Sequence, residues 1–182
     1  KIQHGTSLVY PPVTMGAHVS ASPNHQVHRH TSLIMRGHVA MSGNLGYELD
    51  FSKLSQLERK MIKDQITLYK EIRPIIQFGT YYRLLSPFAG NQAAWQFVSQ
   101  DLSETVVMYF RMMAQPAEPF HILRLRGLDP EKEYLDTHTS LIYGGEELMY
   151  AGLSIPEMKG YYCSMFWRLA FDGYEKINNI ES

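Results

Sequence analysis

The clearest periodic pattern of hydrophobic and polar positions lies between residues 57 and 76. Apolar side chains recur there at the spacing of one helical face, and charged side chains occupy most of the opposite face. Ser55 followed by Glu58 is a capping-box pattern that predicts the start of this helix, and Pro74 predicts its end. The apolar positions are Leu57, Met61, Ile62, Leu68, Tyr69, Ile72, Ile75 and Ile76.

The residues before this helix alternate between extended and helical patterns. Gly16–Ser20 is a short extended run bounded by proline-containing turns, and Leu45–Leu49 is a second one. Between them, Thr31–Met41 can form a helix that ends at Gly43. Residues 1–78 therefore predict an α/β arrangement in which each strand is followed by a helix.

After residue 78 the pattern changes to short β-rich runs separated by turn residues such as Gly127–Pro130 and Gly144–Gly145. Phe120–Arg126 alternates strictly, with Ile122 and Arg124 on the face opposite Leu123. Strands at this spacing predict an antiparallel β-sandwich over residues 79–182. The predicted runs are Tyr81–Leu85, Ala94–Ser99, Glu104–Ala114, Phe120–Arg126, Glu133–Thr137, Ser140–Tyr143, Glu147–Tyr150 and Tyr161–Phe171.

Composition narrows the class of protein. The chain has 182 residues, is 45% hydrophobic and carries a net charge of −1, so no basic surface favours nucleic acid or an anionic membrane. No apolar run approaches the roughly 18 residues that span a bilayer. The single Cys163 stands in an apolar run and cannot form an internal disulfide. These features predict a soluble, cytoplasmic protein.

Five dispersed segments stand out in order along the chain: Tyr10–His25, Arg36–Asp50, Tyr82–Phe88, Gly127–Pro130 and Tyr143–Met149. Together they resemble the retaining α-galactosidases of glycoside hydrolase family 36. The resemblance implies the end of a catalytic (β/α)₈ barrel over residues 1–78, followed by a C-terminal antiparallel β domain over residues 79–182. It also implies a homo-oligomer, possibly a tetramer, and no metal or other cofactor.

A barrel of this kind cannot close within residues 1–78. A closed (β/α)₈ barrel takes about 250 residues and eight strands, whereas this part of the chain supplies two strand–helix units. Its strands would have bare edges and no opposite wall for their inward side chains. We therefore expect the rest of the barrel to come from an upstream segment or from a separate chain.

The catalytic pair is expected to lie outside this chain. Retaining glycoside hydrolysis uses two carboxyl groups about 5–5.5 Å apart, and the resemblance implies that both are aspartates upstream of Lys1. Asp129 stands in a turn, where an aspartate usually caps its own backbone. Glu48 and Asp50 are the only acids expected near a barrel mouth. We predict no catalytic residue here and no activity for the chain alone.

The loop after the first strand is the best candidate for substrate contact, because barrel active sites form at the carboxyl ends of the strands. Its candidate substrate-binding residues are His18, Asn24 and His25, whose polar groups can hydrogen-bond sugar hydroxyls. The alternatives are that His18 packs inside the barrel and that Asn24 makes the turn after Pro23.

Two other kinds of site are open. Six of the eight histidines fall within the first 38 residues, which invites a metal site, but no Cys or His-Glu pattern accompanies them and we predict no metal. Trp95 and Trp167 could form a sugar-stacking platform, although tryptophans inside apolar strands are more often core. The leading prediction is the C-terminal portion of an enzyme that hydrolyses terminal α-linked galactose from oligosaccharides. The alternative is a non-catalytic β-sandwich module for carbohydrate binding or for an interface.

Overall fold

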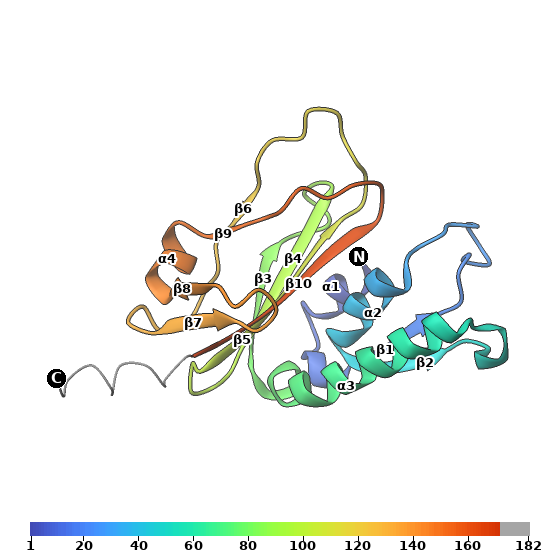
Figure 1. Cartoon of the computed structure of the whole chain (residues 1–182), viewed down its shortest axis with the longest axis horizontal. Coiled ribbons are helices and arrows are strands. Elements are labelled where there is room, and N and C mark those ends of the chain that lie inside the picture. Colours follow the sequence, from blue (N-terminus) through green and yellow to red (C-terminus); the bar gives the residue numbers. More distant parts are fainter. Residues whose placement is uncertain (172–182) are drawn as a thin grey trace.

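The structure, a computed structural model, describes residues 1–171. Residues 172–182, the end of the predicted second domain, lie outside the described residues. Figure 1 shows a central sheet with α4 and the small β6–β9 pair on one side and α1 to α3 on the other. No helix among the described residues is long and apolar enough to cross a membrane.

From Gly16 on, the first part of the chain has the predicted order of strands and helices, and a short helix that the sequence did not predict precedes them. Ser32 caps α2 by accepting a hydrogen bond from the Met35 N–H, and Ser55 and Glu58 form the predicted capping box of α3. The elements are α1 (Ile2–Thr6), β1 (Gly16–Ser20), α2 (Leu33–Met41), β2 (Asn44–Glu48) and α3 (Gln56–Phe78), with 3₁₀ turns at Pro12–Thr14 and Phe51–Lys53.

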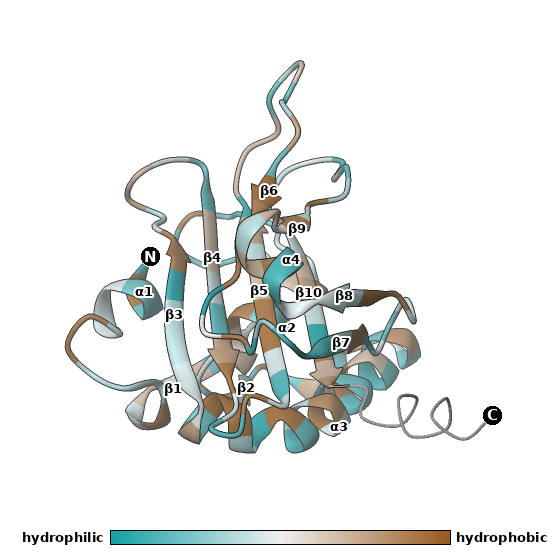
Figure 2. Ribbon diagram, turned by 90° about the vertical axis from the view of Figure 1, so that its left-hand side faces the viewer, coloured by the Kyte–Doolittle hydropathy of each residue, from teal (hydrophilic) through white to brown (hydrophobic). Residues whose placement is uncertain are grey.

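Helix α3 differs from the prediction in two respects. It continues through Pro74 to Phe78. The proline removes only one N–H donor, and burial of Ile75 and Ile76 stabilises the helix beyond it. Leu57, expected on the apolar face, is exposed in the first turn, whereas Gln65 takes a buried place on that face. The amphipathic character of the helix is visible as alternating colours along its length (Figure 2).

The second part of the chain forms a six-stranded antiparallel sheet and a separate two-stranded one. The strand order of the large sheet is β3-β4-β5-β10-β7-β8, and β6 pairs with β9. The strands are β3 (Thr80–Leu85), β4 (Gln92–Val98), β5 (Glu104–Arg111), β6 (Ile122–Leu123), β7 (Glu133–Asp136), β8 (Ile142–Gly144), β9 (Leu153–Ser154) and β10 (Cys163–Phe171), with α4 at Gly145–Tyr150.

Three of the predicted strands are wrong in type or extent. Glu147–Tyr150 is part of helix α4, in which the Glu147 carboxylate accepts a hydrogen bond from the Gly144 N–H. The three apolar residues Leu148–Tyr150 are too few to show a period, so they suit a strand or one helical turn equally, and packing of Leu148 in the core decides for the helix. In Phe120–Arg126 only Ile122–Leu123 is a strand, although the predicted alternation of exposed and buried side chains holds. Strand β5 also stops at Arg111, short of the predicted Ala114.

Both faces of the large sheet are covered, which gives the sandwich-like layering that the sequence predicts. On one face, Val107 and Trp167 pack with Leu148 of α4 and Leu153 of β9. The opposite face, including Met108, packs against α2 and α3. The core on that side is therefore shared between residues 1–78 and the later part of the chain.

Candidate active site

The carboxyl ends of β1 and β2 form one edge of the molecule. The two strands are parallel, with His18 opposite Gly46 and Ser20 opposite Glu48. Parallel pairing brings the loop after Ser20 and the loop after Glu48 to the same end of the pair. The residues that follow both strands can therefore act on one ligand.

One face of the β1–β2 pair is covered and the other is bare. Ala17 and Val19 are buried in a cluster with α2 and α3. His18, with the opposite alternation, is exposed on the uncovered face. Its ring lies over Gly46, where a Cβ would come within 2.6 Å of the His18 Cδ2 atom. A glycine at this position lets the imidazole rest on the neighbouring strand.

Asn24 shapes the loop that follows β1. Its side-chain oxygen accepts hydrogen bonds from the N–H groups of Gln26 (3.0 Å) and Val27 (3.1 Å). The alternative role given to Asn24 by the sequence, a turn former after Pro23, is thus present in the structure. These bonds use the amide oxygen and leave the Asn24 amide NH₂ for another acceptor. His25 follows as an exposed residue near the tip of the loop.

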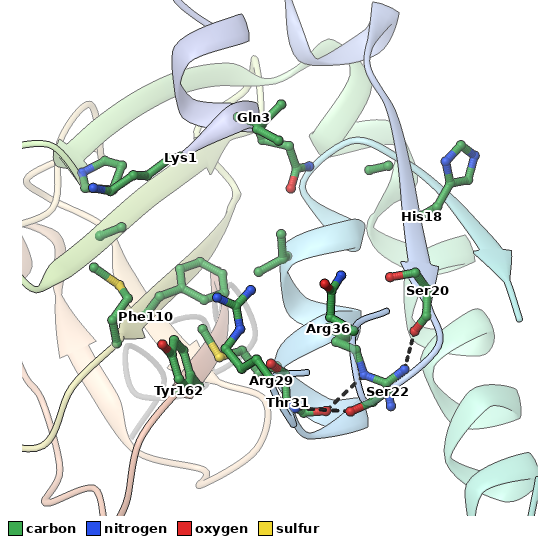
Figure 3. A pocket seen from close by; sticks show the side chains of 18 of the residues that line it. Lys1, Gln3, His18, Ser20, Ser22, Arg29, Thr31, Arg36, Phe110 and Tyr162 are labelled. Carbon is green, nitrogen blue, oxygen red and sulfur yellow. Dashed lines mark hydrogen bonds between the residues drawn. The ribbon is translucent and has the colours of Figure 1, made fainter. Parts of the chain in front are cut away.

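The base of this loop is closed by Arg36 of α2. The Arg36 Nε donates to the Thr31 carbonyl (3.0 Å), and Nη1 donates to the Ser20 carbonyl. The Thr31 N–H donates to the Ser22 hydroxyl (3.2 Å), which completes the closure. Figure 3 shows these bonds joining the two ends of the loop. Burial lowers the pKa of the Arg36 guanidinium, but arginine stays charged at neutral pH.

A cleft of about 730 Å³ lies between this edge and the large sheet. His18 and Asn24 line it from the first part of the chain, whereas His25 is not among its lining residues. Trp95 and Tyr162 line it from the second part. The structure therefore brings two of the three candidate residues to one cleft and leaves the third outside it.

The acids near this edge do not form a catalytic pair. None of the described residues that line the cleft is Asp or Glu. Asp50 accepts hydrogen bonds from the Ser52 hydroxyl (2.6 Å) and N–H (2.9 Å), which lower its pKa and make it a cap for the turn that follows. Asp129 likewise accepts from the Glu131 N–H, as its turn predicts. Asp50 is therefore not poised to exchange a proton near neutral pH.

Other candidate sites have a plain structural account. Within residues 1–171 no three His, Cys, Asp or Glu side chains gather as metal ligands. Trp95 and Trp167 are only 5% and 6% exposed, so they are core residues and form no sugar-stacking platform on the surface, although the edge of Trp95 that is not covered lines the cleft.

Comparison with known proteins accounts for most of the chain. Residues 1–79 match the Melibiase family model, and residues 92–169 match the model of the glycosyl hydrolase family 36 C-terminal domain. The chain is 58% identical over 169 residues to α-galactosidase AgaA of Geobacillus stearothermophilus, which covers 93% of this chain and 23% of that protein. The chain belongs to glycoside hydrolase family 36.

Other family 36 proteins agree with this assignment. α-Galactosidase Mel36A of Lactobacillus acidophilus is 48% identical over 161 residues, with 88% of this chain and 22% of that protein covered. The crystal structure of AgaA superposes with a TM-score of 0.91 at 57% identity, over 93% of this chain and 24% of that one. The chain thus spans about a quarter of the length of its relatives and corresponds to their C-terminal portion.

Three residues beside the cleft of this family 36 chain were not singled out from the sequence. Arg36 opens one of the matching segments, but its loop-closing role depends on where Ser20 and Thr31 lie in space. Arg29 and Tyr162 are far apart in sequence, yet the Arg29 guanidinium lies 4.8 Å from the centre of the Tyr162 ring. No local pattern predicts a contact between positions so far apart.

Proposed function

We propose that this chain is the C-terminal portion of an α-galactosidase that releases terminal α-linked galactose from oligosaccharides. The identity of 58% over nearly the whole chain to AgaA carries this proposal. Solved structures of AgaA variants in complex with raffinose and with stachyose indicate the class of substrate. The proposed reaction is a retaining double displacement through a galactosyl-enzyme intermediate.

Both catalytic aspartates of the proposed enzyme would come from a part of the protein that is not in this chain. A retaining hydrolase needs two carboxyl groups about 5–5.5 Å apart. The cleft has no carboxyl group among its described lining residues, and Asp50 is held as a cap. Residues 1–182 alone would therefore lack the chemistry, while supplying one wall of the galactoside pocket.

The bare face of the β1–β2 pair supports this assignment. Parallel strands are normally covered on both faces, because their connections place helices or other strands over them. Here α2 and α3 cover the face of Val19, and His18 and Ser20 stand on the uncovered one. We propose that further strands of the barrel continue the pair and enclose this face. The subunit number and the cytoplasmic location stay predictions.

The test compares the complete protein with residues 1–182 on an aryl α-galactoside. The complete protein should turn over the substrate with retention at the anomeric carbon, and the chain alone should show none. An inactive complete protein would overturn the proposed reaction. Turnover by residues 1–182 that is lost in Glu48→Gln or Asp50→Asn would overturn the placement of the catalytic pair. Galactose binding by residues 79–182 alone would instead favour a carbohydrate-binding module.

A further inference from the structure

The loop between Ser20 and Thr31 has little support of its own. Its side chains are exposed, apart from the half-buried Asn24 and Thr31, so no apolar core holds it. Loops with few buried contacts open readily, and their conformation depends on whatever contacts remain. The proposed function places this loop at the galactoside pocket, and the inference below rests on that proposal.

Arg29 fixes the loop by two contacts. Its carbonyl accepts a hydrogen bond from the Asn24 N–H (2.9 Å), which closes the turn that holds Asn24. Its guanidinium lies over the Tyr162 ring, 4.8 Å from the ring centre, in the arrangement of a cation–π contact. Figure 3 shows Arg29 beside Tyr162 among the side chains that line the cleft. The turn around Asn24 is thereby tied to the β domain.

Tyr162 is itself held firmly on the β-domain side. Its N–H donates to the Met112 carbonyl (2.8 Å), and its backbone has a φ of 53°. The buried Arg111 side chain donates to the carbonyls of Met158 (2.7 Å) and Gly160 (2.9 Å) and pairs with Glu118. The segment that precedes β10 is thus clamped before the chain reaches Tyr162.

The strand that follows Tyr162 is anchored to the helix that follows the loop. The His38 Nδ1 of α2 is 2.9 Å from the Ser164 hydroxyl of β10, and the His38 and Phe166 rings are 5.5 Å apart. β10 therefore contacts α2 directly, and Tyr162, the residue just before β10, contacts the loop that precedes α2. One segment of the β domain thus contacts both the loop and the helix that follows the loop.

We propose that Tyr162 is a positioning residue for substrate binding, which holds the loop of Asn24 and His25 in place through Arg29. The β domain then has a role in the reaction beyond covering the barrel. It adds a contact from outside to a pocket loop that has no apolar core of its own. Tyr162 touches neither the substrate nor the reacting atoms in this proposal.

The experiment uses the complete protein with Tyr162→Ala, Tyr162→Phe and Tyr161→Ala. Tyr161 is the matched control, because it is the adjacent tyrosine, is 61% exposed and has no cation over its ring within residues 1–171. Alanine and phenylalanine both keep a Cβ at position 162, so the left-handed backbone there meets the same steric limit. Amide hydrogen exchange of residues 24–29 is measured without substrate, followed by kcat and KM.

Tyr162→Ala should speed exchange in residues 24–29 by about two- to fivefold, the factor expected from losing an exposed cation–π contact. It should raise KM for an α-galactoside by about the same factor with little change in kcat, since loop order affects binding. Tyr162→Phe should restore both, because the ring face that attracts the cation is kept. Arg29→Gln should match Tyr162→Ala, and the double variant should add nothing further.

The hydrogen-exchange measurement and the kinetic measurement test different parts of the proposal. If Tyr162→Ala changes loop exchange no more than Tyr161→Ala, the positioning role is wrong, whatever the enzyme does. If loop exchange responds as expected but KM does not, the loop is held by Tyr162 without serving the substrate, and the inference is also overturned. If the unsubstituted complete protein turns over no α-galactoside, the proposed function fails while the exchange result still stands.

Discussion

Gly37 of α2 shows how one residue sets the distance between the two helices of the first part. A Cβ at this position would lie 2.3 Å from the Nε2 atom of Gln65 on α3. That amide is fixed, because Nε2 donates to the Leu33 carbonyl (3.0 Å) and Oε1 accepts from the Tyr47 hydroxyl (2.9 Å). Burial also raises the pKa of Tyr47 to about 12, so the hydroxyl keeps its proton to donate. The missing side chain at Gly37 makes room for this hydrogen-bonded amide.

Gly37→Ala should therefore destabilise the chain. Displacing the Gln65 amide breaks two hydrogen bonds worth about 1 kcal/mol each and leaves buried groups unpaired, against a helix-propensity gain of about 1 kcal/mol. We expect a net loss of about 1–2 kcal/mol in the free energy of unfolding, measured by chemical denaturation. Gly90→Ala is the control, because a Cβ there meets no atom within 4 Å. Equal stability of the two variants would contradict this account.

At the scale of elements, the sequence pattern predicted which helices and strands exist better than it predicted where they end. The apolar periodicity and the capping box gave α3 and its start correctly, since both signals are local. Pro74 misled about its end, because tertiary burial of Ile75 and Ile76 outweighs one missing hydrogen bond. The prediction of a strand at Glu147–Tyr150 was wrong, because a run this short shows no periodicity that separates a strand from a helix.

Pro74→Ala tests how much the proline costs α3. Pro74 is exposed and lies inside the helix, so alanine would add an N–H able to bond one turn back without changing the packed face. Proline in a helix interior costs about 3 kcal/mol, and its stiffening of the unfolded chain returns up to about 1 kcal/mol. We expect Pro74→Ala to stabilise the chain by about 1–2 kcal/mol in denaturant unfolding. A loss of stability would mean that the proline fixes the exit of the helix after all.

At the scale of the whole molecule, the two parts of the chain are joined by a shared core and by polar contacts. Arg168 of β10 pairs with Glu71 of α3 and with Glu104 of β5. His38 of α2 is half-buried against Ser164 and Phe166 of β10, where desolvation lowers its pKa to about 4. The contact between α2 and β10 thus favours the neutral form of the His38 imidazole.

This makes the joined structure sensitive to acid. The unfolded chain protonates His38 near its usual pKa of about 6.5, whereas the folded chain resists until about pH 4. The neutral imidazole therefore contributes fully to the free energy of unfolding above pH 6.5. This contribution is lost as pH falls toward 4, by about 3 kcal/mol in all. His38→Gln should flatten the dependence of unfolding free energy on pH in this window. His25→Gln, at an exposed loop position, should keep the full dependence; an unchanged slope in His38→Gln would refute the assignment.

The sequence by itself determined the order of strands and helices over residues 16–78, the α/β character of that part and the antiparallel β character of the part that follows. It also determined the family, through motifs spread over the chain, because these signals depend on local periodicity, turn chemistry and residue identity. Only the tertiary structure decided that His18 and Asn24 border one cleft while His25 does not. It alone brought Arg29 to Tyr162 and His38 to Ser164. Such pairs are far apart along the chain, and packing of α2 against β10, which no local pattern specifies, is what brings them together.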